Sequence, residues 1–263
     1  MNSPSPHLVQ DRHHPDPRGD ELLVLAAAGD ADRLADFRRR HAAGEPAPYI
    51  VGFIHFRGHR FSIDRRAYVT DPEATHLVDT VAAETSTLTA RLGRTPRLVE
   101  FGSGAGTLAL SLLLEHPDWS VTGLDIDPAA MALARENATA HGAALALLES
   151  DYFSAWPVDA EPPDVLFGDP PWGGPTDLYD DTRDAFYYEQ MPPLSAFPGG
   201  ESPCGIHDEL IVRLCAAGWP STLILNYGVL PPERIARSAA PLASWRVVRP
   251  RPRMSILIGH ART

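Results

Sequence analysis

The residues best suited to chemistry in this chain lie in the run Asp164–Trp172, which reads Asp-Val-Leu-Phe-Gly-Asp-Pro-Pro-Trp. The apolar residues predict a buried strand that ends in Asp169, two prolines and Trp172. Proline has no N–H, so the carbonyl of Pro170 is not expected to join a sheet ladder. A carboxylate, a carbonyl and a flat ring suit a planar ligand that carries N–H groups, such as an amide, a guanidine or an aromatic amine. Taken alone, the run is also compatible with an ordinary proline-rich loop.

A second motif, Leu98–Leu110, joins an apolar strand, a glycine turn and the start of a helix without a gap. Its glycines are Gly102, Gly104 and Gly106. This G-x-G-x-G spacing differs from the dinucleotide fingerprint G-x-G-x-x-G, because Thr107 stands where the third glycine would be. Many strand-to-helix turns need glycine at positive φ, so the order of the motifs that follow carries more information than the turn itself.

Acidic residues end the next two predicted strands. The run Val121–Pro128 places Asp125 and Asp127 about twenty positions after the glycine turn, where an acid is suited to bind ribose hydroxyls. The run Ala144–Asp151 ends in Asp151. Each of these acids, read alone, is equally compatible with a helix cap or a turn. The complete ordered set favours a nucleoside-type ligand.

This ordered set resembles the class I S-adenosylmethionine-dependent methyltransferases. The resemblance implies S-adenosyl-L-methionine as the cofactor and a set of cofactor-binding residues: Glu100, Gly102, Gly104, Gly106, Asp125, Asp151 and Tyr152. Glu100 would lie near the methionine moiety, and the three glycines would let the backbone approach it closely. Asp125 would accept the two ribose hydroxyls, and Asp151 would accept from the adenine amino group. Tyr152 or Phe153 would pack on the adenine face.

A closer resemblance covers the chain from about residue 38 to its end. The segment Gly44–Gly52 is similar to the G-E-P-x-x-Y-x-x-G element of the glutamine-N5 methyltransferases that modify peptide release factors, the HemK/PrmC family. Phe56–Asp64 resembles the short hairpin of that family, and Ser150–Ala155 resembles its third motif. Pro192–Ala196 is similar to the stretch that follows its catalytic corner. The resemblance implies that Asp169, Pro170 and Trp172 are the catalytic residues, with Pro171 beside them against the substrate.

The corner departs from this family in a way that bears on the substrate. Asp169 stands where the family has asparagine, Trp172 where it has tyrosine, and Thr70–Thr75 where it has a Pro-Arg-Pro-Glu-Thr run. Asparagine both donates to and accepts from a glutamine amide, whereas an ionised aspartate only accepts. We therefore favour an amino or guanidino nitrogen of a small molecule. A release-factor glutamine and an exocyclic amine of a nucleic acid remain as alternatives, the latter because Asp-Pro-Pro-Trp is also similar to the corner of mRNA adenine methyltransferases.

The charge of the chain counts against a polynucleotide substrate. The formal net charge is −11, and every fixed positive side chain is an arginine, because the sequence contains no lysine. Binding through phosphates needs a basic face. The only candidates for such a face are Arg38–Arg40 and the arginines of Arg246–Arg253, and the second cluster is better explained as a solvated face.

Other compositional features exclude further classes. Cys204 and Cys215 have neither the spacing nor the neighbours of a zinc site or a disulfide framework, so we expect no metal. No apolar stretch approaches the length of a membrane helix, and the first residues lack the order of a signal peptide. We expect a soluble, cytoplasmic protein that does not bind a membrane.

The alternation of strands and helices predicts an α/β fold, and the resemblance implies a doubly wound, Rossmann-like sheet of seven strands, the last of them antiparallel. Thr222–Asn226 predicts a further central strand, and Trp245–Pro250 with Met254–His260 predicts the closing antiparallel pair. Residues 76–263 would form this methyltransferase domain.

The residues before this domain predict a smaller N-terminal part. Residues 1–18 have a composition typical of disorder. Residues 19–75 would hold a short helical element over Asp20–His41, broken at Gly29, and a β-hairpin over Tyr49–Val69.

A long segment between Gly173 and Gly205 is rich in Asp, Pro, Tyr and Gly and starts at the predicted substrate corner. Long loops in compact domains are usually functional or mobile. Tyr187 and Tyr188 in this segment, together with Tyr68, are candidates to line a substrate cage. An ordinary helix that buries Tyr187 in the core is an equally good interpretation.

Overall fold

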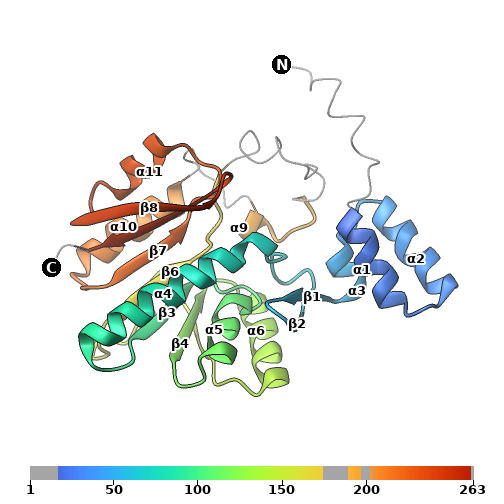
Figure 1. Ribbon diagram of the computed structural model, residues 1–263, viewed down its shortest axis with the longest axis horizontal. Coiled ribbons are helices and arrows are strands. Elements are labelled where there is room, and N and C mark those ends of the chain that lie inside the picture. The colour runs from blue at the N-terminus through green and yellow to red at the C-terminus, as the bar shows by residue number, and fades with distance from the viewer. Residues whose placement is uncertain (1–16, 174–188, 197–201, 203, 262–263) are drawn as a thin grey trace.

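The computed structural model describes residues 17–173, 189–196, 202 and 204–261. A seven-stranded sheet lies between layers of helices, and a helical lobe projects from one end (Figure 1). The sheet strands are β3 (Arg97–Phe101), β4 (Ser120–Asp125), β5 (Ala146–Glu149), β6 (Val165–Gly168), β7 (Thr222–Asn226), β8 (Ser244–Arg251) and β9 (Met254–His260). Their spatial order is β5-β4-β3-β6-β7-β9-β8. β3 to β7 pair in parallel, whereas β9 runs antiparallel to both of its neighbours, which confirms the predicted fold.

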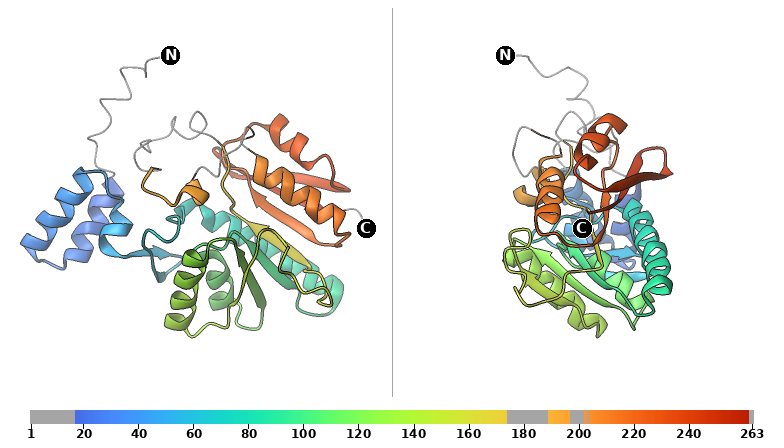
Figure 2. Two further views of the ribbon diagram at one scale, coloured as in Figure 1. Left: turned by 180° about the vertical axis from the view of Figure 1, so that it is seen from behind. Right: turned by 90° about the vertical axis from the view of Figure 1, so that its left-hand side faces the viewer.

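Helices cover both faces of the sheet because its central strands bury side chains on both sides. On β3, Leu98 packs into the core beneath α4 (Thr75–Leu92) and α5 (Thr107–Glu115). Val99 packs into the core beneath α10 (Gly205–Ala216) and α11 (Pro232–Ala239). The right-hand view of Figure 2 shows α4 and α10 on opposite sides of the sheet. The helices of this domain are α4 (Thr75–Leu92), α5 (Thr107–Glu115), α6 (Pro128–His141), α9 (Pro193–Ala196), α10 (Gly205–Ala216) and α11 (Pro232–Ala239), with a 3₁₀ turn, η3 (Pro72–Ala74). None of the helices in the described ranges has the length and apolar character that crossing a membrane requires.

The N-terminal lobe has a small core of its own. It consists of α1 (Pro17–Ala27), α2 (Ala31–Ala42) and α3 (Ala47–Val51). Leu23, Phe37 and Ile50, one from each helix, are buried against one another. A hairpin of β1 (Phe53–Phe56) and β2 (His59–Ser62) joins this lobe to the sheet, as Figures 1 and 2 both show.

One prediction for this region needs correction, and another falls largely on residues that the structure does not describe. The hairpin begins at Phe53 and not at Tyr49, because Pro46 starts a short helix that Gly52 ends in a left-handed conformation. The segment predicted to be disordered lies outside the described residues apart from its last two, which begin α1.

The strand order reverses between β3 and β6, which lie side by side at the centre of the sheet. In open α/β sheets, ligands bind beyond the carboxyl ends of the strands at this switch point. Here β3 leads into the glycine turn and β6 leads into Asp169, so the two chemical motifs of the sequence meet at the switch point.

Candidate active site

The glycine turn presents open backbone between β3 and α5. Gly102 has φ of 70° and Gly104 has φ of 53°, a region that costs other residues about 1–2 kcal/mol. A Cβ atom built on either glycine would meet nothing within 4 Å. These residues therefore leave room for a ligand to lie against the backbone. Gly106, with φ of 77°, forms the N-cap of α5.

Asp125 at the end of β4 is tied to this turn. Its Oδ2 accepts a hydrogen bond of 2.7 Å from the Gly104 N–H, and its Oδ1 accepts one of 2.9 Å from the Asp127 N–H. Burial raises the pKa of the Asp125 carboxyl above its usual range, against the effect of these donors. Asp127 has a different role, because its side chain caps α6 by accepting from the Ala129 N–H at 2.8 Å.

Glu100 is the most deeply buried acid of the site, with 1% of its surface exposed. Burial raises the pKa of its carboxyl well above the usual range. The Ala109 N–H donates to its Oε2 at 3.2 Å and opposes this shift, while the charges of Asp125 and Asp169 add to it. Three carboxyl groups thus lie close together at the C-terminal ends of three neighbouring strands, β4, β3 and β6.

The corner after β6 rests on the end of the next strand, β7. Asn226 donates a hydrogen bond of 2.8 Å from its Nδ2 to Oδ1 of Asp169. Pro170 is buried, and Pro171 and Trp172 are half-buried. A Cβ atom built on Gly228 would lie 2.0 Å from the indole of Trp172, so this glycine permits the close approach of the ring.

Asn226 and Gly228 were missed by sequence reasoning. Their neighbours signal only an apolar strand that ends in a turn, and Asn226 lies 57 positions from Asp169. The order of β6 and β7 in the sheet brings the two side chains together. A third omission is Ile126, which follows Asp125 and is 53% exposed. An exposed apolar side chain at that position is suited to pack on a base.

The remaining predicted residues lie around this centre. Asp151 is exposed at the turn after β5. Tyr152 has φ of 52°, and its ring stacks on Phe101 with centroids 5.2 Å apart, while the guanidinium of Arg213 lies 4.4 Å from the ring centroid. Tyr68 packs against the main core. Tyr187 and Tyr188 lie outside the described residues.

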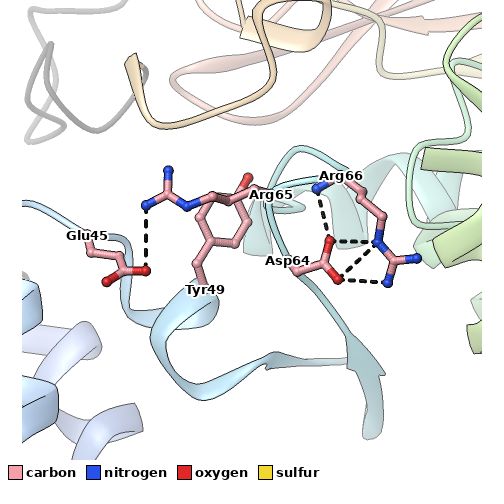
Figure 3. A pocket seen from close by; sticks show the side chains of 5 residues that line it. All are labelled: Glu45, Tyr49, Asp64, Arg65 and Arg66. Atoms are coloured by element: carbon pink, nitrogen blue, oxygen red, sulfur yellow. Dashed lines mark hydrogen bonds and ion pairs between the residues drawn. The ribbon is translucent and has the colours of Figure 1, made fainter. Parts of the chain in front are cut away.

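A cavity of about 480 Å³ lies where the N-terminal lobe meets the hairpin (Figure 3). Its lining residues are Glu45, Tyr49, Asp64, Arg65 and Arg66, so the Gly44–Gly52 element contributes two of them. The charged groups are paired with one another: Arg65 with Glu45 at 3.5 Å, and Arg66 with Asp64 at 2.7 Å. Arg65 also donates to Gln190 at 3.1 Å, so this side of the cavity contacts the residues just before α9.

Comparison with known proteins agrees with the geometry. Residues 74–187 match the family model of the methyltransferase small domain. A release factor glutamine methyltransferase of Streptococcus pneumoniae is 34% identical over 139 residues, 53% of this chain and 47% of that protein. A 4-amino-L-phenylalanine/4-methylamino-L-phenylalanine methyltransferase of Streptomyces pristinaespiralis is 30% identical over 227 residues, 80% of this chain and 75% of that protein.

The chain therefore belongs to the S-adenosylmethionine-dependent methyltransferases, in the group that contains the release factor glutamine methyltransferases. It spans about half the length of the release factor enzymes that it matches. Among solved structures, a ribosomal protein L11 methylase from Lactobacillus delbrueckii subsp. bulgaricus superposes with a TM-score of 0.50 at 16% identity, over 76% of this chain and 84% of that one. At that identity the likeness shows the Rossmann-like fold alone.

Proposed function

We propose that this protein is an S-adenosylmethionine-dependent N-methyltransferase that acts on an amino or guanidino nitrogen of a small molecule. The observation that carries the proposal is the carboxylate of Asp169 at the switch point of the sheet, where it accepts a hydrogen bond from the side-chain amide of Asn226. A carboxylate in that place accepts hydrogen bonds and offers none, which suits a nitrogen that presents only donors. The Streptomyces relative, which matches over most of its length, is named for methylation of an aromatic amine.

The described residues fit the cofactor of the family. The open backbone of Gly102 and Gly104 gives room for the methionine moiety, and Asp125 stands beside it for the ribose hydroxyls. Ile126 and Tyr152 would border the adenine, with Asp151 as the acceptor for its amino group. When bound, S-adenosylmethionine supplies a methyl group on a cationic sulfur, and this positive charge would favour the ionised form of the buried carboxyl groups around it.

The side chains of the corner orient and stabilise the acceptor nitrogen. Asp169 and the carbonyl of Pro170 would accept its N–H groups, which turns the lone pair toward the methyl carbon. Holding the reacting atoms at about 3 Å supplies roughly 7–11 kcal/mol of the barrier reduction. The Asp169 carboxylate also stabilises the positive charge that grows on the nitrogen during transfer. Trp172, held against Gly228, provides a flat surface for a planar acceptor.

The test is a methyl-transfer assay with labelled S-adenosylmethionine, offering 4-amino-L-phenylalanine and a purified release factor as separate acceptors. We expect label in the small molecule and none on the protein. Label on the release factor would overturn the proposed acceptor class. We expect Asp169→Asn to lower turnover by about a hundredfold or more without changing the affinity for S-adenosylmethionine, because an electrostatic contact to the reacting group is lost. A fully active variant would remove the Asp169 charge from the mechanism.

A glutamine side chain of a release factor is the second candidate. It is favoured by the 34% identity to an enzyme named for that substrate. The acid at position 169 counts against it, because a glutamine amide carries both a donor and an acceptor while an ionised aspartate can satisfy only the donor. An exocyclic amine of a nucleic acid is the weakest of the three, since a net charge of −11 opposes phosphate binding.

A further inference from the structure

We infer that Asn226 is a positioning residue of the reaction: it holds the Asp169 carboxylate in one orientation and keeps it in its accepting, ionised form. The inference rests on the proposed role of Asp169. It starts from the hydrogen bond of 2.8 Å between Nδ2 of Asn226 and Oδ1 of Asp169, which joins the ends of β7 and β6. Asn226 is itself 7% exposed, so the donor lies in an environment where water competes little for it.

The orientation of the Asn226 amide is set by a second contact. Its Oδ1 accepts a hydrogen bond of 2.9 Å from the Gly228 N–H. If the amide were turned over, two donors would face each other at Gly228 and two oxygens would face each other at Asp169. Both contacts therefore require the same orientation, with the N–H groups directed at the carboxylate.

The backbone that carries Asn226 is held on several sides. Its carbonyl oxygen lies 2.8 Å from Nε2 of the buried His207 on α10. The next residues are paired to β9, because the Tyr227 N–H donates to the Ser255 carbonyl at 2.8 Å and the Ser255 N–H donates to the Gly228 carbonyl at 2.9 Å. A side chain mounted on such a support fixes its partner more closely than one on a free loop.

The residue type at position 226 follows from the charge of its partner. An aspartate there would place two carboxylates within hydrogen-bond distance, and one of them would have to take up a proton. A leucine would offer no donor, so Oδ1 of Asp169 would lose this hydrogen bond. Asparagine supplies the donor that Asp169 needs and the acceptor that Gly228 needs. The same turn thus fixes both parts of the corner, since Gly228 also lies against Trp172.

The experiment compares the wild-type protein with Asn226→Ala and Asn226→Ser. The serine variant keeps an oxygen for the Gly228 N–H but is too short to reach Asp169, so it separates the two contacts. Ser238→Ala is the matched control. It removes a hydroxyl on α11 that lies 2.6 Å from the phenol oxygen of Tyr227, the residue after Asn226, and it leaves the contact with Asp169 in place. Carbon-13 NMR of labelled aspartate follows the titration of the Asp169 carboxyl, which is assigned with Asp169→Asn.

We expect the titration midpoint of Asp169 to rise by about one pH unit in both Asn226 variants and to stay in place in Ser238→Ala, because a donor to the ionised form has been lost. With 4-amino-L-phenylalanine as the acceptor, turnover should fall by about tenfold to a hundredfold, and the acidic limb of the rate profile should move to higher pH. The dissociation constant of S-adenosylmethionine should not change. An unmoved midpoint in the serine variant would overturn the inference.

The two proposals can fail separately. If the wild-type protein leaves 4-amino-L-phenylalanine unmethylated while the midpoint still moves, the acceptor is wrong and the support of Asp169 by Asn226 stands. If the wild-type protein methylates the amine while the midpoint and the acidic limb are the same in all three variants, the function stands and Asn226 has no positioning role.

Discussion

Asp125 and Asp127 are close in sequence at the end of β4, yet they bind different groups. Asp125 accepts from the backbone of the glycine turn, whereas Asp127 caps α6. We therefore expect that ligand binding, the role proposed for Asp125, and helix stability can be separated by substitution.

We predict that Asp125→Ala lowers the affinity for S-adenosylmethionine by about a hundredfold or more, because a charge-assisted contact to each ribose hydroxyl is lost. Asp127→Ala should cost about 1 kcal/mol of folding stability through loss of the cap and leave the affinity unchanged. Calorimetric titration measures the first effect and urea unfolding the second. Equal affinities for the two variants would contradict the assignment of Asp125.

Gly228 provides a second test at the residue scale. We predict that Gly228→Ala lowers turnover by about tenfold to a hundredfold, since the new methyl group would lie 2.0 Å from the Trp172 indole and push the ring out of place. Gly218→Ala is the control: φ is 63° there against 50° at Gly228, and a Cβ would meet nothing within 4 Å. The left-handed backbone should cost each variant about 1–2 kcal/mol of stability. The contact with Trp172 adds a further loss in Gly228→Ala alone, and only that variant should lose activity. Full activity in Gly228→Ala would mean that the position of Trp172 is unimportant.

At the scale of elements, α10 is docked to β7 through a histidine that stays neutral. His207 is buried, and this burial lowers its pKa to about 4, although the Asn226 carbonyl and the charge of Asp208 act in the opposite direction. Its Nδ1 has no hydrogen-bond partner among the described residues, so a proton placed there would be buried without an acceptor.

This histidine predicts a pH dependence of stability. Between about pH 6.5 and 4 the unfolded chain binds a proton at His207 that the folded protein does not, so folding stability falls as the pH falls through this range. We expect the His207 contribution to drop by about 2 kcal/mol from pH 7 to pH 5, and His207→Gln to lack this part of the dependence. Urea unfolding at the two pH values measures the difference. Parallel losses in the two proteins would show that His207 does not carry the effect.

One arginine of the hairpin has several partners in the sheet domain. Arg57 pairs with both carboxylate oxygens of Glu115 on α5, at 2.6 and 2.7 Å, and with Asp79 on α4 at 2.7 Å. Its side chain is only 17% exposed, so these ion pairs should contribute more to folding stability than an isolated pair on the surface.

At the scale of the whole molecule, the sequence predicted those parts that local patterns encode. Apolar runs marked the central strands, the spacing of Gly102 and Gly104 marked the turn after β3, and Asp125 marked the end of β4. The short helix α3 was not predicted because its residues are apolar, include Pro48 and follow Pro46, so that they also fit an extended segment. The contact between Asn226 and Asp169 could not be predicted, because it depends on the spatial order of strands and not on any spacing along the chain.

The hydrogen bond between Asp169 and Asn226 also bears on how such enzymes change specificity in evolution. The exchanged pair, with asparagine at 169 and aspartate at 226, uses the same two groups with donor and acceptor reversed. Codons for these amino acids differ by one base, so two mutations separate the arrangements. The intermediate with two amides keeps a hydrogen bond, whereas the intermediate with two carboxylates brings like charges together. A lineage that starts from the present pair can therefore pass to an acceptor that is an amide if position 169 mutates first, whereas the reverse change requires position 226 to mutate first.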